Sequence, residues 1–384
     1  MGREGSETQR QDAANLSLLP GITPEAVESE EMPRVQVTRH RALVFGVFIV
    51  SVVAFLYFVL PRLTGFGKTW DRIDTGDPAW LGLAVGFEIL AYSSYVALFR
   101  SVFARGSTRI GWRQSYQITL AGLMATRLFA AAGAGGVLLM AWALRRSGMA
   151  RRVVARRMLA FLTMLYTVYM AAFVVDGIGL RTGLFPGGGA FAITVVPAIV
   201  GGVLIGLMLL VSLIPDGIEE RLERRGQRSG RVGHWLARVV AVPAFAASAV
   251  RTALSIPRNR DLGAFGAVTW WGFDIAVLWA SFHAFGHPPP YAVIVMAYFV
   301  GMLGNLLPLP GGVGGVDGGM IGALIAFNVD SGLAVVAVLA YRAIAFWLPI
   351  APGAVAYFAL RRSIHRWQGE TPDATAGTSR PATA

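Results

Sequence analysis

The chain has 384 residues, of which 55% are hydrophobic and only 15% are charged. This balance excludes an ordinary soluble globular protein and indicates a polytopic membrane protein. The sequence contains no cysteine, which excludes disulfides, thiolate zinc sites, Fe–S clusters and cysteine nucleophiles.

The net charge of +12 comes almost entirely from arginine, with Lys68 as the only lysine. In a soluble protein such an excess would suggest nucleic acid. In a membrane protein it first indicates topology and affinity for anionic lipid. Arginine in place of lysine, together with abundant Ala and Gly, is typical of a high-GC bacterial genome.

The first forty residues are polar and include Pro20 and Pro33, so they predict a disordered cytoplasmic tail. The apolar stretch Ala42 to Leu60 follows and is long enough to span a bilayer. It has no small-residue cleavage site, so we interpret it as a spanning helix rather than a signal peptide.

Loop charges set the direction of the next segments. Residues 100–113 hold four arginines and no acid, which places this loop in the cytoplasm and makes Ala79 to Phe99 an inward span. Apolar Tyr116 to Leu144 leads to a second basic loop, 145–157. A single crossing cannot leave both loops inside. A turn at Gly133, Gly135 and Gly136 therefore predicts a re-entrant helix pair, whose return arm from Val137 would be only about 12 Å long.

The remaining chain continues this alternation. The basic region 216–261 is predicted to be cytoplasmic, with an amphipathic helix on the inner leaflet at His234 to Ile256, or, as the alternative, a further span. Residues 366–384 are a second predicted disordered tail. The other full crossings are predicted at Met158 to Val175, Phe191 to Ile214, Leu262 to Phe285 and Leu333 to Leu360.

The stretch 301–330 is apolar yet cannot be a plain helix, because it is interrupted by Pro308, Pro310, Gly311, Gly312, Gly314 and Gly315. We interpret it as a second re-entrant pair, entering as Tyr291 to Leu307 and returning as Met320 to Phe327. The alternative is a Pro-Gly kink in an ordinary span. At membrane depth, such a broken backbone must be buried in protein or line a wet cavity. It is therefore a candidate binding site.

Two parts of the chain resemble each other. Residues 127–136 align with 305–314, and Gly86-Phe87-Glu88-Ile89 aligns with Gly272-Phe273-Asp274-Ile275. The predicted topology gives the halves, about 79–176 and 262–360, opposite orientations. The predicted fold is thus all-α, with six full spans, two re-entrant pairs and both termini cytoplasmic. Inverted repeats are typical of transporters and place the site at their interface near the midplane.

Five charged residues lie in apolar surroundings, where they should face inward and pair. Arg342 lies about 15 Å from the outer end of its span, and we expect Asp317, or otherwise Asp274, as its partner. Glu88 and Asp274 are expected to be buried acids at related positions. The functional interpretation is an anionic headgroup held by Arg127, Arg342 and the amides of the glycine turns; the structural one is ion pairs that hold helices together. Asn305 either caps freed backbone groups or contacts the ligand.

Motifs of soluble catalysis are missing. The sequence contains no P-loop, no GxSxG elbow and no HExxH, and its five histidines lie near interfaces or tails. We therefore predict no metal, no cofactor and no catalytic residue.

With the segments 126–136, 142–149, 308–319 and 339–349 in view, the chain resembles the lysylphosphatidylglycerol synthase transmembrane region family, also called the flippase-like domain family, over about residues 40 to 365. The resemblance implies a bacterial inner-membrane protein related to the lipid-translocating half of aminoacyl-phosphatidylglycerol synthases. Family members often carry Glu at position 317, and Asn and Pro at positions 127 and 130, where this chain has Asp317, Arg127 and Ala130. The aminoacyl-transferase domain is absent.

Three functions are compatible with these observations. The first is a translocase for an anionic phospholipid or glycolipid. The second is a noncatalytic membrane subunit or scaffold for a lipid or cell-envelope glycolipid enzyme, and a membrane-embedded transferase is a third. The expected partners are membrane lipids, with a lipid-synthesis enzyme or a second copy of the chain as further candidates, and no nucleic acid.

Overall fold

The fold is known from a computed structural model that describes residues 76–104, 110–128, 134–213, 246–253, 255, 262–307, 309 and 312–369. These residues are helical and contain no strand, in agreement with the predicted all-α class. The predicted first span, most of the basic region 216–261 and the N-terminal tail lie outside the described residues. The last helix continues to Gly369 and so extends into the predicted C-terminal tail.

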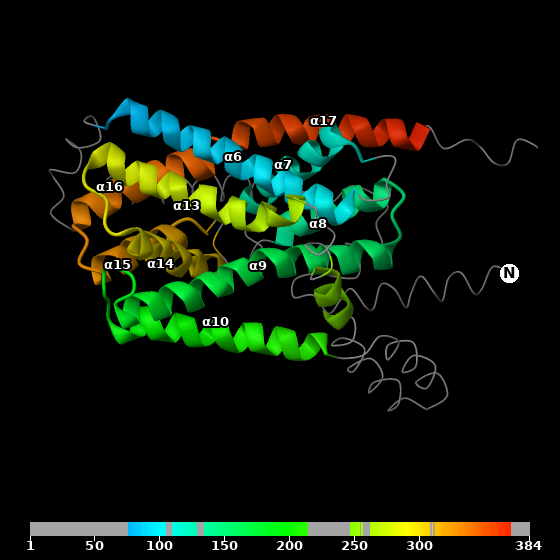
Figure 1. The fold of residues 1–384 in the computed structure, drawn as a ribbon. Helices are drawn as coiled ribbons and strands as arrows, with labels where there is room; N and C mark the ends of the chain where they lie inside the picture. The colour runs from blue at the N-terminus through cyan, green and yellow to red at the C-terminus, as the bar shows by residue number, and fades with distance from the viewer. Residues whose placement is uncertain are drawn as a thin grey trace, which may run out of the picture.

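The bundle is built from long helices that run along a common direction (Figure 1). These are α6 (Pro78–Phe103), α9 (Arg151–Thr182), α10 (Phe191–Ser212), α13 (Gly266–Phe285, preceded by the 3-10 turn η2, Leu262–Phe265) and the succession α16 (Ser331–Arg342), η5 (Ala343–Trp347) and α17 (Ile350–Gly369). Figure 1 shows α6, α10 and α16–α17 running one way, and α9 and α13 running the other. The bundle therefore alternates in direction as the loop charges predicted.

Four segments of the described chain are long and apolar enough to cross a membrane: Pro78–Phe103, Arg151–Thr182, Phe191–Ser212 and Ser331–Ile364. Helix α13 is not among them, because Asp274 and His283 lower its hydropathy. Exposed aliphatic side chains cover α10 in particular, at Val196, Ile199, Val200, Val203, Leu204, Leu207, Leu209 and Leu210. Lipid is the solvent that suits such a surface, so the chain is a multi-pass membrane protein.

Two pairs of shorter helices lie between these long helices. The first is α7 (Trp112–Leu128) with α8 (Ala134–Arg146), and the second is α14 (Tyr291–Met302), extended by the 3-10 turn η3 (Leu303–Leu306), with α15 (Gly315–Ala326). Within each pair the helices pack against each other. The α7–α8 pair reaches inward from one end of the bundle, and the α14–α15 pair from the other (Figure 1). Helix α8 has 13 residues and is longer than the predicted return arm.

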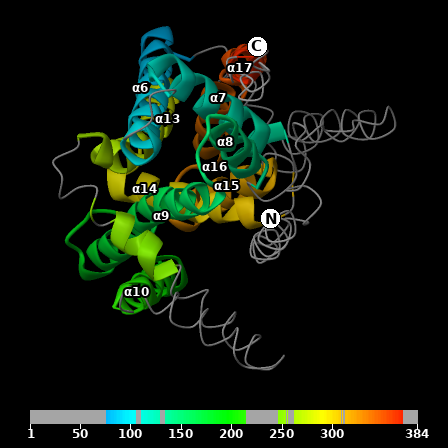
Figure 2. The ribbon, with the colours of Figure 1, turned by 90° about the vertical axis from the view of Figure 1, so that its right-hand side faces the viewer.

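Viewed along the bundle, α14, α15 and α16 lie toward the middle, whereas α10 lies at the edge beside α9 (Figure 2). Helices α6 and α13 pack along each other, and α17 packs on α7. The second helix pair therefore lies among the other helices, while Asn305, Leu306 and Gly314 at its interruption are exposed.

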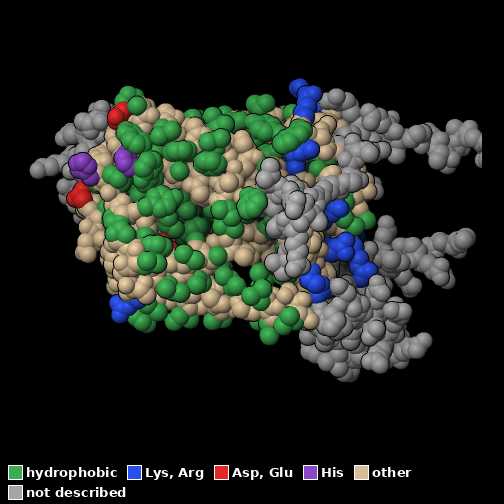
Figure 3. All heavy atoms as spheres, viewed as in Figure 1, with side chains coloured by type: hydrophobic (Ala, Val, Ile, Leu, Met, Phe, Trp, Pro, Cys, Tyr) green, Lys and Arg blue, Asp and Glu red, His purple; other side chains and the backbone are tan. Residues whose placement is uncertain are grey.

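Charge is distributed unevenly between the two ends of the bundle. Figure 3 shows most of the visible Lys and Arg side chains at one end and the histidines at the other. The basic end is formed by the termini that carry Arg100, Arg113, Arg145, Arg146, Arg151, Arg152, Arg361 and Arg362. The two ends of the bundle therefore differ in charge, as the positive-inside rule predicts for a membrane protein.

Glycines allow the helices of each short pair to approach closely. A Cβ on Gly304 would lie 2.3 Å from the backbone carbon of Gly315, and a Cβ on Gly136 would lie 2.4 Å from the carbonyl oxygen of Gly122. Close approach through small residues is the usual way in which helices associate in lipid, where the hydrophobic effect does not drive them together.

We expect Gly304→Ala to lower the free energy of unfolding in detergent by about 1 to 3 kcal/mol, because the added methyl group meets backbone that cannot rotate away. Gly322→Ala in α15 is the matched control. Its Cβ has no neighbour within 4 Å, so its effect should be within about 1 kcal/mol. Equal melting temperatures for the two variants would contradict this account of the packing.

Candidate functional site

The two acids that the sequence placed at related positions meet where α6 crosses α13. Phe87 and Phe273 stack there, with ring centroids 6.2 Å apart, and each precedes one of the acids. Glu88 is 2% exposed and Asp274 is 6% exposed, as predicted. The two phenylalanines that the sequence alignment pairs are therefore in contact.

Phenol groups surround Asp274. Its Oδ2 accepts a short hydrogen bond from the Tyr298 hydroxyl of α14 and a second one, of 3.2 Å, from the Tyr341 hydroxyl of α16. Glu88 lies within hydrogen-bonding reach of Asp274 and of Tyr92, one helical turn further along α6. The pair of acids is therefore held by four helices from both halves of the chain.

Arg127, at the end of α7, connects the first half to an irregular turn of the second. Its guanidinium donates to the carbonyl oxygens of Ala345 at 2.6 Å and Phe346 at 3.2 Å, and to the Tyr92 hydroxyl at 2.5 Å. The Ala345 carbonyl needs such a donor, because the residue four positions later is Pro349, which has no N–H. Arg127 thus satisfies backbone that the π turn η5 leaves open.

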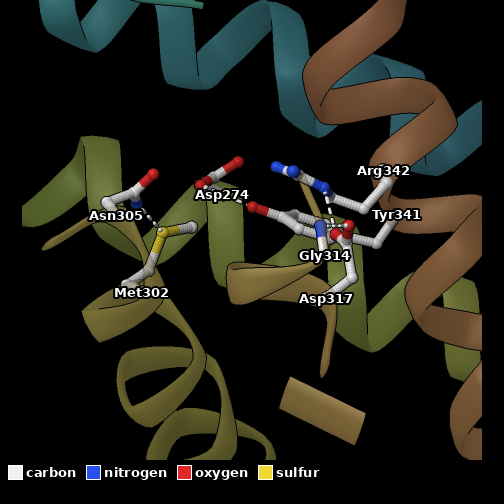
Figure 4. Close-up of polar contacts among 7 residues, drawn as sticks. All are labelled: Asp274, Met302, Asn305, Gly314, Asp317, Tyr341 and Arg342. Atoms are coloured by element: carbon white, nitrogen blue, oxygen red, sulfur yellow. Dashed lines mark hydrogen bonds and ion pairs between the residues drawn. The ribbon is translucent and has the colours of Figure 1, made fainter. Parts of the chain in front are cut away.

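Arg342, the last residue of α16, forms an ion pair through its Nε with Oδ1 of Asp317. Figure 4 shows Tyr341 and Arg342 pointing from α16 toward Asp274 and Asp317. The other oxygen of Asp317 accepts from the Gly314 N–H at 2.9 Å and so caps α15. The guanidinium also lies over the Phe346 ring, 4.5 Å from its centroid. The partner that the sequence predicted first for Arg342 is thus confirmed.

The interruption between α14 and α15 lies beside this ion pair. Gly312 and Gly314 have left-handed φ angles of 65° and 83°, which glycine adopts without strain. Asn305 is exposed, and its amide nitrogen lies 3.4 Å from the Met302 sulfur (Figure 4). Among the described residues, Asn305 therefore makes no hydrogen bond that caps a backbone group. Pro308, Pro310 and Gly311 fall outside the described residues.

Glycines at the start of α8 allow this helix to pack closely against α7. Gly136 belongs to the first turn of α8 and touches Thr126 and Gly122. In the second pair, a Cβ on Gly315 would lie 3.0 Å from the carbonyl oxygen of Gly304. Gly135 precedes Gly136 in the same helical turn, and Gly133 lies outside the described residues.

The sequence analysis missed the hydroxyl groups that complete the cluster, those of Tyr92, Tyr298 and Tyr341. The sequence positions of two of these tyrosines could have indicated their role. Tyr92 follows Glu88 by four residues and shares its helix face, and Tyr341 directly precedes Arg342. Tyr298 has no such mark and reaches Asp274 only through tertiary packing. Asp176 of α9 is a further buried acid that the sequence analysis did not single out.

Together these contacts define an all-helical membrane protein with three buried carboxyl groups and two guanidinium groups in its interior, of which Arg127, Asp317 and Arg342 lie beside interrupted helices. The sequence matches the family described as Lysylphosphatidylglycerol synthase TM region over residues 43–353. The chain therefore belongs to that family, as its motifs indicated. No curated protein matches the chain.

Proposed function

We propose that this chain is a membrane lipid translocase for an anionic phospholipid or glycolipid. The supporting observation is that the half-buried guanidinium of Arg127 and the buried one of Arg342 lie beside interrupted helices where the two halves of the chain meet. A negatively charged headgroup needs such cations to enter an apolar interior.

The position of the helix interruptions near the middle of the bilayer supports the proposed lipid translocation. Helices α14 and α16 start at the same end of the bundle and have 12 residues each, so each is about 18 Å long. Their inner ends then lie near the middle of a hydrocarbon core about 30 Å thick. Asn305, Leu306 and Gly314 are exposed at this level. Exposed irregular backbone at the midplane favours a water-filled path, because lipid cannot satisfy it.

The ion pair between Arg342 and Asp317 supplies a route for the headgroup. A lipid phosphate can replace the Asp317 carboxylate on the guanidinium, since both anions suit its planar donors. Arg342 stays paired throughout this exchange, and the displaced Asp317 keeps the hydrogen bond from the Gly314 N–H. Asp317 thus holds the site together when no lipid is bound.

The proposed topology has six full spans, with α7–α8 and α14–α15 as re-entrant pairs in inverted repeats. The basic end of the bundle faces the cytoplasm of a bacterial inner membrane, and both termini lie on that side. The charge asymmetry of Figure 3 supports this orientation.

Cysteine labelling tests the orientation in this cysteine-free chain. Ala150, an exposed residue before α9, and Leu184, which is 75% exposed after α9, mark the two ends of one helix. In intact cells an impermeant maleimide should label Leu184→Cys and should leave Ala150→Cys unlabelled until the membrane is opened. Labelling of Ala150→Cys from outside would overturn the orientation.

Reconstitution tests the function itself. The purified chain in vesicles should move labelled phosphatidylglycerol between leaflets, measured with an impermeant reductant that destroys label in the outer leaflet. Labelled phosphatidylcholine and protein-free vesicles are the controls, and both should be slower. A protein that is folded but inert toward labelled anionic phospholipids and glycolipids, and active only when a lipid-synthesis enzyme is added, would instead be the noncatalytic subunit.

A further inference from the structure

The buried carboxyl groups of Glu88 and Asp274 lie close enough to share a hydrogen bond. They come from equivalent positions of the two halves and meet at the crossing of α6 and α13. Any movement of one half against the other therefore changes the contact between them.

The contact requires a proton. An ionised carboxylate only accepts hydrogen bonds, and two carboxylates that share a buried site cannot both be ionised without a large cost. Glu88 and Asp274 lie within hydrogen-bonding reach of each other. Oε2 of Glu88 is buried and has no partner within the described part of the chain. One of the two groups must therefore carry a proton to donate to the other.

The charges around Glu88 and Asp274 also favour one proton on this pair. The positive charge of Arg127 interacts electrostatically with both acids, whereas Arg342 forms an ion pair with Asp317. With one proton on the pair, the cluster holds two negative and two positive charges, and without it the cluster holds one uncompensated buried negative charge. The titratable and charged groups that face the pair from the packed helices are Tyr92 of α6, Arg127 of α7, Tyr298 of α14, and Tyr341 and Arg342 of α16.

We propose that Glu88 and Asp274 form a binding site for one exchangeable proton, through which lipid translocation, as proposed above, is coupled to a proton gradient. When the halves move apart, the two carboxyl groups separate, the shared hydrogen bond breaks, and the proton leaves to water as H⁺. When the halves close, one H⁺ from water binds again. No bond of the lipid is made or broken.

Infrared spectroscopy of the purified, full-length protein tests the proton directly. The wild type at neutral pH should show the C=O stretching band of a protonated carboxyl group, and this band should be lost in Glu88→Gln and in Asp274→Asn. Asp77→Asn is the matched control, because Asp77 is an exposed N-cap and Asn caps equally well. If one variant fails to fold by circular dichroism, the other carries the test. Absence of the wild-type band, or its survival in a folded variant, would overturn the proton site.

Vesicles test the coupling. With the membrane potential clamped at zero, a gradient of one pH unit should hold labelled anionic lipid at up to about a tenfold excess in one leaflet if one proton moves per lipid. Reversing the gradient should reverse the excess. A distribution that ignores the gradient while lipid still moves would overturn the coupling and would leave the proposed function intact. Failure of the proposed function appears differently, as no lipid movement at any pH, and it would end the coupling while the infrared band remained.

Discussion

We expect Arg342→Ala to lower the free energy of unfolding by about 3 to 5 kcal/mol, because the substitution leaves the buried Asp317 carboxylate without its cation. The second substitution Asp317→Asn should restore much of this loss. Asn keeps an oxygen that accepts from the Gly314 N–H and removes the uncompensated charge. Unfolding of the two single variants and the double variant in mixed micelles measures the coupling between the residues.

Transport should respond differently from stability. If Arg342 binds the headgroup, the double variant should be folded and inserted, yet unable to move anionic lipid. Arg342→Lys should be intermediate, because it keeps the charge and loses the planar fork that matches a phosphate. Full transport by the stably folded double variant would remove Arg342 from the site and leave it a structural ion pair.

The second large effect is expected at Arg127. Arg127→Ala removes the donors to the carbonyl groups of Ala345 and Phe346, and each unsatisfied carbonyl costs roughly 1 to 3 kcal/mol. We therefore expect a loss of about 2 to 5 kcal/mol in the free energy of unfolding. Arg127→Lys should recover only part of it, because one ammonium group does not reproduce the forked geometry.

A change at Pro349 isolates the cause. Pro349→Ala returns an N–H four residues after Ala345, which can satisfy that carbonyl within the helix. Arg127→Ala should then cost less in the Pro349→Ala background than in the wild type. If the cost is the same in both backgrounds, the role that we assign to Arg127 is wrong, and its contact with Tyr92 accounts for its effect instead.

The equivalence of the halves has a structural consequence that composition alone could not reveal. Matching residues from two repeats need not touch, yet Phe87 contacts Phe273 and Glu88 reaches Asp274. Related residues touch only where a symmetry axis passes. Helices α6 and α13 also form the most extensive contact among the described helices.

The sequence by itself determined the class of the protein, the relative direction of its long helices and four of its buried charged residues, Glu88, Asp274, Asp317 and Arg342. The reason is physical: in lipid, apolar runs must span, basic loops stay inside and isolated charges turn inward. These rules act on short stretches of chain. They predicted the two short helix pairs and the pairing of Arg342 with Asp317.

Only the tertiary structure decided what the buried groups touch. The carbonyl partners of Arg127 are more than 200 positions away along the chain, and they exist because η5 and Pro349 interrupt a helix that the sequence predicted to be continuous. The three tyrosines around Glu88 and Asp274 come from three different helices. Hydrogen bonds of this kind depend on how helices rotate and cross, and hydropathy carries no information about rotation or crossing.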